Sequence, residues 1–296
     1  QQINEKCKQE KFEPPVIIVI GTAADTKLNW LTSKPLFGKN IVITRDADGN
    51  ADFASRIISK GGVPIALPTI KIKPLTDTTQ FLQTPAKISE FDWIIFTSIN
   101  GVTIFFDALQ QLNKDARIFA SAKIAAIGSE TAAKLDQFGI KTDFVPTVYI
   151  NIELGRQLRD SANLQGKKVL LLRSALASNK LAELLEQGGA KVDSIAVYTA
   201  LTNKTDCSWL NEKISNDQID WLTFASPSSV RGFFEQIDSK LVNSSSAKVA
   251  SIGPVTSEQL KSLGIKIDMQ ATEHTIDGLL AAIESSEERK AENRGI

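Results

Sequence analysis

The sequence predicts an α/β protein built from two homologous α/β modules with parallel sheets. From Gly38 onward, short β-rich runs alternate with helical patterns, which is typical of parallel strands joined by crossover helices. The second half of the chain also repeats the first half, which indicates two copies of one unit. The length of 296 residues suggests about two domains, and 42% hydrophobic with 23% charged residues is an ordinary globular composition.

The expected strands follow one another along the chain, each a short β-rich run. They are Ile41–Thr44, Val63–Leu67, Trp93–Thr97, Lys123–Ile127, Thr142–Val145, Val169–Leu172, Val192–Val197, Trp221–Phe224, Lys248–Ile252 and Lys266–Met269. Helices are expected in the intervals between them.

Blocks of the first half return in the second half in the same order and with nearly the same offset. The matched blocks are Gly38–Arg45 with Gly166–Arg173, Gly61–Gly62 with Gly188–Gly189, Asp92–Ser98 with Asp220–Ser226, Ala126–Thr131 with Ser251–Thr256, and Gly139–Lys141 with Gly264–Lys266. The two glycine pairs follow helical patterns, where a residue at positive φ can end the helix, so we expect a structural role for them.

Polar residues and glycines stand where strands end and helices begin. In the first half these are the blocks at Ser98 and Gly128, and their counterparts in the second half are at Ser226 and Gly253. Ligands bind at this edge of an open α/β sheet, and the free N–H groups of helix N-termini receive anions. Helix capping alone would explain each Ser or Thr individually. Two such openings in each module, with an arginine at a strand end in each half, favour a ligand site.

Rare residues argue against several kinds of site. The chain has two cysteines, Cys7 and Cys207, and a single histidine, His274, whereas zinc and iron–sulfur sites need three or four such ligands together. No disulfide scaffold is expected. A Ser-His-Asp triad would need His274, which we instead expect to be solvent-exposed beside a helix N-cap. Neither a P-loop nor a Gly-x-Gly-x-x-Gly run occurs, so the usual phosphate and dinucleotide cradles are missing.

Charge and hydropathy give no reason to expect nucleic acid or a membrane as a partner. Lys and Arg number 34 and Asp and Glu number 34, so the formal net charge is zero. The longest apolar run, Val16–Ile20, is far shorter than the ~18 residues of a membrane span. We therefore expect a soluble cytoplasmic protein.

The order and spacing of several blocks match one family over roughly Pro35 to Glu284. The blocks are Gly38–Arg45, Asp92–Val102, Ala126–Gly128 with Thr131, Ser194–Tyr198, Phe224–Val230, and Ile252–Pro254 with Thr256. Single blocks are weak signals, but together they make the chain resemble uroporphyrinogen-III synthase.

The first residues resemble a different protein. Pro14–Gly21, Leu28–Leu31 and Pro35–Gly38 are similar to the extreme C-terminus of uroporphyrinogen-III C-methyltransferase where it runs into a fused synthase. The chain also begins with Gln1, so we expect residues 1–37 to be a methyltransferase-like remnant and linker of a trimmed or degenerate bifunctional polypeptide. The cofactor-binding body of a methyltransferase is absent, so methyl transfer is not assigned. The alternative is an N-terminal strand and linker helix without a function of its own.

The resemblance implies two modules joined by two passes of chain, with the active site in the cleft between them. The expected boundaries are residues 38–72 plus 202–286 for module 1, residues 73–201 for module 2 and residues 287–296 for a charged tail. The two passes, at Ile70–Pro74 and Tyr198–Thr202, are expected to form a two-stranded crossover that can act as a hinge.

The resemblance also implies a lyase of tetrapyrrole biosynthesis that acts on hydroxymethylbilane. This substrate is a linear tetrapyrrole with eight carboxylates, which is cyclised with inversion of the last pyrrole ring and loss of water, and no cofactor is required. Because the substrate also closes spontaneously without inversion, the enzyme must chiefly impose geometry and favour departure of the hydroxyl.

Candidate site residues follow from the resemblance and from the strand ends. Tyr198 is the candidate catalytic residue, a proton donor to the leaving hydroxyl, and its alternative role is packing that supports the hinge. Tyr149, the only other tyrosine, is interpreted as packing. The candidate substrate-binding residues are Arg45, Ser98, Asn100, Gly101, Gly128, Thr131, Arg173, Ser174, Ser226, Ser228, Ser229, Gly253 and Thr256. Two positions depart from other members, which carry Arg in place of Asn100 and can carry a hydroxyl in place of Val255.

Two other functions fit the same sequence. A bilobed α/β protein with a central cleft could be a non-catalytic small-molecule binding protein, because fold alone does not fix function. Residues 14–37 also suggest a partner subunit of a methyltransferase, fused or neighbouring. Formation of the type III isomer separates an enzyme from a binding protein, and binding of S-adenosylmethionine would support the methyltransferase subunit.

Overall fold

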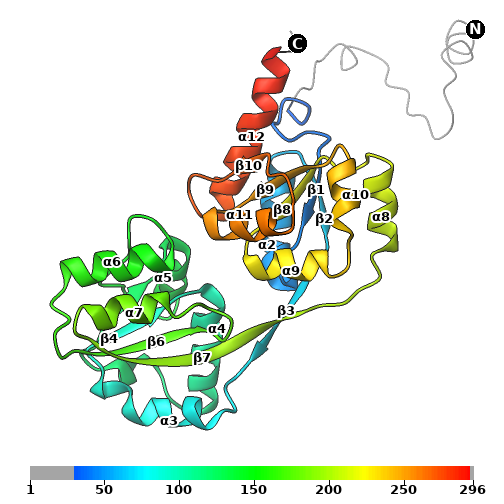
Figure 1. The fold of residues 1–296 in the computed structure, drawn as a ribbon. Helices are drawn as coiled ribbons and strands as arrows, with labels where there is room; N and C mark the ends of the chain where they lie inside the picture. The colour runs from blue at the N-terminus through cyan, green and yellow to red at the C-terminus, as the bar shows by residue number, and fades with distance from the viewer. Residues whose placement is uncertain (1–29, 294–296) are drawn as a thin grey trace, which may run out of the picture.

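The computed structural model describes residues 30–293, which form two lobes (Figure 1). The part of the expected N-terminal remnant before Trp30, including Cys7, lies outside the described residues. No helix within the described range is long and apolar enough to cross a membrane.

Each lobe is built on a five-stranded sheet. In the first lobe the order is β10-β9-β8-β1-β2, with bounds Met269–Gln270, Lys248–Ser251, Trp221–Phe224, Asn40–Ile43 and Val63–Ala66. In the second lobe the order is β3-β7-β6-β4-β5, with bounds Ile70–Pro74, Lys191–Thr202, Lys168–Ser174, Trp93–Phe96 and Lys123–Ala126. Neighbouring strands are parallel in every pair except β3 with β7.

Helices connect these strands in both lobes. Those of the first lobe are α2 (Ala47–Ser59), α8 (Ser208–Ser215), α9 (Pro227–Phe234), α10 (Ser239–Ser244), α11 (Pro254–Ser262) and α12 (Ile276–Asn293). Those of the second lobe are α3 (Thr79–Lys87), α4 (Ile99–Gln111), α5 (Ser129–Asp136), α6 (Asn151–Ser161) and α7 (Lys180–Gln187).

The helices cover both faces of each sheet, because successive strand residues point into two different cores. In β4, Ile94 and Phe96 pack with Phe105 of α4, whereas Ile95 packs with Leu158 of α6 on the other face. Both β4 and β8 are buried along their whole length. Continuous apolar strands of this kind are typical of parallel sheets enclosed by helices.

Each lobe combines strands from both halves of the sequence repeat. The strand β1 lies beside β8, and β6 lies beside β4. Equivalent aspartates fix both pairs, because Asp220 Oδ2 accepts a hydrogen bond from the backbone N of Asn40 and Asp92 Oδ2 accepts one from the backbone N of Lys168, each at 2.8 Å. The repeated Asp-Trp block therefore positions the neighbouring strand in both lobes.

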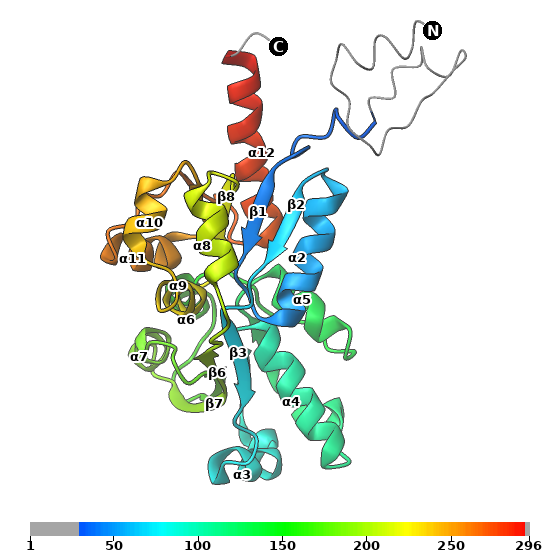
Figure 2. The same cartoon turned by 90° about the vertical axis from the view of Figure 1, so that its right-hand side faces the viewer.

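Two antiparallel strands join the lobes. The strand β3 pairs with β7 from Ile70 opposite Thr202 to Pro74 opposite Tyr198. Figure 2 shows β3 leading out of the first lobe into the second. With the two parallel sheets, this crossover confirms the predicted fold class, while the residue boundaries of the two modules stay a prediction.

Two expected strands are largely missing. Thr142–Val145 forms a single isolated bridge, and Lys266–Met269 contributes only its last residue to β10. In both segments an aspartate side chain, Asp143 or Asp268, accepts a backbone N–H of the neighbouring strand at 2.8 or 2.9 Å. In a regular ladder a backbone carbonyl would accept that N–H, so the side chain interrupts the pairing.

The repeated glycine pairs lie at helix ends, as expected. Gly61 and Gly189 have φ angles of 87° and 86°, in the left-handed region that favours glycine. They follow α2 and α7 and release the chain into β2 and β7.

Helix α12 continues through the start of the segment expected as a charged tail. Its Glu287 forms ion pairs with Lys39 at 2.9 Å and with Lys248 at 2.7 Å. These lysines stand at the amino ends of β1 and β9, so the contact joins α12 to the sheet of the first lobe.

Candidate active site

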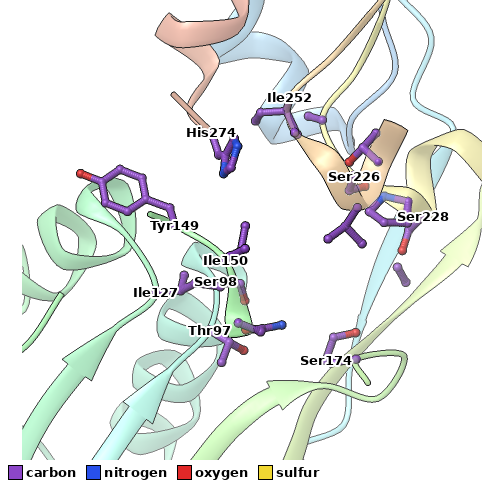
Figure 3. A pocket seen from close by; sticks show the side chains of 18 of the residues that line it. Thr97, Ser98, Ile127, Tyr149, Ile150, Ser174, Ser226, Ser228, Ile252 and His274 are labelled. Atoms are coloured by element: carbon purple, nitrogen blue, oxygen red, sulfur yellow. The ribbon is translucent and has the colours of Figure 1, made fainter. Parts of the chain in front are cut away.

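A cavity of about 850 Å³ lies between the two lobes. Its lining comes from the carboxyl ends of parallel strands, from the first turns of α4, α5, α9 and α11, and from the crossover. In Figure 3, residues of the second lobe, among them Thr97, Ser98 and Ser174, face Ser226, Ile252 and His274 of the first lobe. Both sheets therefore present their ligand-binding edge to one space.

Most of the predicted site residues line this cavity. The lining includes Arg45, Ser98, Asn100, Gly128, Thr131, Ser174, Tyr198, Ser226, Ser228, Gly253 and Thr256. It does not include Gly101, Arg173 and Ser229. The Arg173 guanidinium instead donates to the carbonyl oxygen of Ser178, with 3.0 Å between Nη1 and O.

The Tyr198 phenol is held at the floor of the second lobe's part of the cavity. The side chain is only 8% exposed, and its hydroxyl donates a hydrogen bond to Ser98 Oγ at 2.9 Å. Burial is the main cause that raises the pKa of Tyr198, and the negative charge of Asp46 raises it further. The phenol therefore carries its proton at neutral pH and can donate it. The same ring packs in the core of the second lobe, so the packing role also fits this geometry.

The serines predicted at two helix openings are N-caps. Ser98 Oγ accepts the backbone N–H of Gly101 at 3.0 Å, and Ser226 Oγ accepts that of Ser229 at 3.1 Å. Ser229 is fully buried and completes a capping box by bonding back to Ser226. Capping therefore uses the N–H groups of Gly101 and Ser229, so these groups are not free for a ligand.

The openings at Gly128 and Gly253 are built differently. These glycines are the N-caps of α5 and α11 and cap them without a side-chain hydrogen bond. The first backbone N–H groups of a helix have no partner within the helix. Thr131 and Thr256, in the first turns, line the cavity but are only 3% and 2% exposed.

The charged residues of the lining are of both signs. The basic ones are Arg45, Lys180 and Arg231, and the acidic ones are Asp46, Glu130 and Glu258. Arg231 hydrogen-bonds to neutral groups, Ser228 Oγ and Gln259 Oε1, both at 3.3 Å. Among residues 30–293 neither Arg45 nor Arg231 has an acidic partner within 4.0 Å, so both can meet an anionic ligand. In the same part of the chain no cluster of His, Cys, Asp or Glu is arranged to hold a metal ion.

The sequence interpretation missed two aromatic residues of the lining, Tyr149 and His274. Both are half-buried, so the expectation that His274 is solvent-exposed is wrong. The loop carrying His274 folds over the start of α11, which sequence periodicity does not reveal. Burial lowers the pKa of His274, so its imidazole is neutral at neutral pH.

Several known proteins are similar to this chain in sequence or in fold. The porphyrin biosynthesis protein HemD of Ruminiclostridium josui is 28% identical over 280 residues, which cover 94% of this chain and 55% of that protein. The chain thus spans about half of that relative's length. The uroporphyrinogen-III synthase of Chlorobaculum parvum is 28% identical over 233 residues, which cover 78% of this chain and 92% of that protein.

One partial match concerns methyltransferases. The uroporphyrinogen-III C-methyltransferase of Bacillus subtilis is 26% identical over 140 residues, which cover 47% of this chain and 28% of that protein. This match covers too little of either protein to assign methyltransferase membership to the chain.

A solved structure has the same fold. The crystal structure of a mutant uroporphyrinogen III synthase from Thermus thermophilus matches 85% of this chain and 99% of that one, with a TM-score of 0.60 and 17% identity. The family model for uroporphyrinogen-III synthase HemD matches residues 51–281, which include every strand of the two sheets except β1 and most of the cavity lining. The chain therefore belongs to the uroporphyrinogen-III synthase family.

Proposed function

We propose that this chain cyclises hydroxymethylbilane to uroporphyrinogen III, with inversion of the last pyrrole ring and loss of water. The observation that carries the proposal is the cavity of about 850 Å³ between the lobes, lined by a buried phenol and by two arginines that have no acidic partner among the described residues. Ligand pockets measure about 300–1,000 Å³, so this cavity is near the upper end of that range and suits a large ligand, while the arginines suit an acidic one. Family membership supports this activity over a binding protein without catalysis.

The basic residues and helix starts of the lining are proposed to hold the carboxylates of the substrate. Arg45 and Arg231 supply charged donors from the first lobe, and Lys180 supplies one from the second lobe. The remaining predicted side chains of the lining, such as Ser174 and Ser228, are proposed to contact uncharged parts of the substrate, whereas Gly101 and Ser229 take part in helix capping. Arg173, which bonds to Ser178, is proposed to shape the loop after β6.

Tyr198 is proposed as the proton donor in the first chemical step. The bond between the hydroxymethyl carbon and its oxygen breaks, its electron pair stays on oxygen, and the oxygen leaves as water with the Tyr198 proton. The terminal pyrrole then loses its N–H proton and becomes the neutral, electrophilic azafulvene, and that proton returns the Tyr198 phenolate to the phenol. General acid catalysis of this kind contributes about 10²–10⁴-fold, while binding in a fixed geometry decides which carbon is attacked.

The isomer of the product tests this proposal. Purified protein is incubated with hydroxymethylbilane, and the uroporphyrinogen isomers are separated after oxidation. An active synthase yields the type III isomer faster than spontaneous closure yields type I. A protein that only binds the substrate would leave type I as the sole product and would overturn the proposal.

We also propose that residues 1–37 derive from the end of a C-methyltransferase, and that a fused or neighbouring enzyme of that kind consumes the product. The partial match to a C-methyltransferase supports this proposal. Because the chain lacks a methyltransferase body, calorimetric titration with S-adenosylmethionine is expected to show no binding. Binding would instead support a partner subunit of a methyltransferase. We further propose that this chain is soluble and located in the cytoplasm.

A further inference from the structure

Tyr149 and His274 occupy equivalent positions in the two lobes. Each lies just before a helix of its lobe, α6 beginning at Asn151 and α12 beginning at Ile276. The offset between Tyr149 and His274 equals the offset between Gly128 and Gly253 in the repeated blocks. The two rings are therefore copies of one position that now carry different chemistry.

The equivalence extends to the loop that carries each ring. Upstream of Tyr149, Asp143 Oδ2 accepts the backbone N–H of Ile124 at 2.8 Å, and Asp143 N donates to the carbonyl of the same residue. Upstream of His274, the side chain and N–H of Asp268 make the same two bonds to Val249. Each loop is thus anchored to its sheet in the same way before it turns toward the cleft.

Each ring lies directly against the glycine that caps a helix at the cleft. A Cβ atom on Gly128 would lie 2.8 Å from Tyr149 Cγ, and one on Gly253 would lie 2.9 Å from His274 Cδ2. Both glycines have extended backbones, with φ near 180°, so it is the ring contact and not the backbone that requires glycine. The fold therefore reserves space for a ring at the same place in both lobes.

Both rings line the cavity, and they come from opposite lobes (Figure 3). Both are half-buried. Within residues 30–293 neither the Tyr149 hydroxyl nor the His274 nitrogens form a hydrogen bond with the protein. Each ring rests with one side on the backbone, and its polar atoms have no hydrogen-bond partner among the described residues. Such a ring is suited to contact a ligand.

We propose that Tyr149 and His274 are substrate-positioning residues, each a platform on which one pyrrole unit of the linear tetrapyrrole lies. This inference rests on the proposed function. The substrate repeats one acidic pyrrole unit, and the protein repeats one ring platform, so two units can be held in equivalent ways. One platform is a phenol and the other an imidazole, but it is the flat ring that both supply.

Removing each ring tests the proposal through the split between KM and kcat. Aromatic contacts of this type contribute about 0.5–1.5 kcal/mol, which is about two- to tenfold in an equilibrium constant. Tyr149→Ala and His274→Ala are each expected to raise KM for hydroxymethylbilane by about three- to tenfold, with a smaller change in kcat. Restoring a ring should restore KM, so Tyr149→Phe and His274→Tyr are expected to stay within twofold of the wild type.

Neighbouring residues give matched controls. Val148 and Glu273 stand at equivalent positions in the same two loops, are exposed and do not line the cavity. Val148→Ala and Glu273→Ala are therefore expected to leave KM unchanged. If Tyr149→Ala fails to fold, Tyr149→Leu replaces it, because leucine fills the space over Gly128 without a flat ring.

The outcomes separate this inference from the proposed function. If ring removal leaves KM within twofold while the wild type forms the type III isomer, the rings only pack against the glycines and the inference is overturned. If Ala variants raise KM but ring-restoring variants do not lower it, the platforms are also refuted. If the wild type forms only the type I isomer, the proposed function itself fails.

Discussion

The two lobes agree in their frameworks and differ where they face the cleft. In each lobe the aspartate of the repeated Asp-Trp block, Asp92 or Asp220, bonds to the start of the neighbouring strand at 2.8 Å. In each lobe a lysine also lies over the tryptophan that follows, Lys123 over Trp93 and Lys248 over Trp221. Contacts that set strand register are thus the same in both copies.

Two differences between the copies lie in the cavity lining. Tyr198 of one crossover strand stands where the repeat places Ile70 in the other, and both line the cavity. Tyr149 and His274 are likewise different side chains at equivalent positions of the repeat, and both line the cavity. The two copies therefore share the contacts above and place different side chains at these two lining positions.

The largest expected effect comes from removing the hydroxyl that only one crossover strand carries. Tyr198→Phe keeps the ring in its core and removes only the donor to Ser98 Oγ. We expect kcat to fall by at least ~10²-fold, because general acid catalysis contributes about 10²–10⁴-fold. KM and the midpoint of thermal unfolding should change little.

The equivalent position supplies the control for Tyr198→Phe. Ile70→Val removes one methylene from the other crossover strand, at a cost of about 0.5–1.5 kcal/mol in stability. Its kcat is expected to stay within a few fold of the wild type. A fall of less than tenfold for Tyr198→Phe would favour the packing role, in which catalysis is mostly orientation by the cleft.

A smaller effect is expected at the two arginines that end equivalent strands. Arg45 lines the cavity without an acidic partner among the described residues, whereas Arg173 donates to Ser178 O. Arg45→Ala should raise KM by tenfold or more, since a hydrogen bond to a charged group contributes about 1.5–3 kcal/mol. Arg173→Ala should raise KM less.

Steady-state kinetics at low and moderate salt measure this difference between the arginines. Salt screens the attraction between a partly exposed arginine and an anionic substrate, so the effect of Arg45→Ala should shrink as salt rises. Equal effects of the two substitutions would show that cavity lining does not distinguish the arginines.

Much of the fold could be predicted from the sequence, because buried parallel strands are continuous apolar runs. The run Trp221–Phe224 is a strand with the same bounds as predicted, and β4 differs from its prediction only by Thr97. The runs ending at Val145 and Met269 failed, because an aspartate side chain in each takes a backbone N–H that a strand would have bonded. The pattern of apolar residues does not show that a side chain, and not a backbone carbonyl, accepts the N–H of the neighbouring strand.

The sequence predicts only those features of the site that depend on residues close together in the chain. Ser98 and Ser226 are visible in the sequence because helix caps depend on residues a few positions away. Tyr149 and His274 were missed, because their place over Gly128 and Gly253 depends on how a loop folds back onto another helix. Extending the repeat alignment past Lys141 and Lys266 would have paired them.

The two lobes differ in how deeply they bury the ion pairs at the amino ends of their strands. In the first lobe, Glu287 of α12 is paired with Lys39 and Lys248 and also accepts the Trp221 Nε1–H at 3.1 Å, and its side chain is 9% exposed. In the second lobe, the ion pair of Lys168 with Glu90 is formed by side chains that are 50% and 55% exposed.

Replacing one acid in each lobe measures that difference. Glu287→Gln should lower the free energy of unfolding by about 1–3 kcal/mol, because it leaves Lys248 partly buried without its anion and leaves Lys39 with Asp220 alone. The exposed partner, Glu90→Gln, should change it by less than ~0.5 kcal/mol. Urea unfolding at pH 7 gives both values, and equal losses would show that burial of the pair is irrelevant.

The smallest expected effect is the pH dependence of the Glu287 contribution. Burial opposes ionisation of this carboxyl, but hydrogen bonds and charges from Lys248 and Lys39 outweigh burial and lower its pKa from 4.5 to about 2. A depressed folded-state pKa means that the ionised group stabilises the fold fully above the unfolded pKa, and that this stabilisation is lost as pH falls from 4.5 toward 2. The difference in unfolding free energy between wild type and Glu287→Gln should therefore be constant above about pH 5.5 and shrink by about 1–2 kcal/mol at lower pH. A difference that stays constant down to about pH 3 would mean that the Glu287 carboxyl is not held as an anion by these lysines.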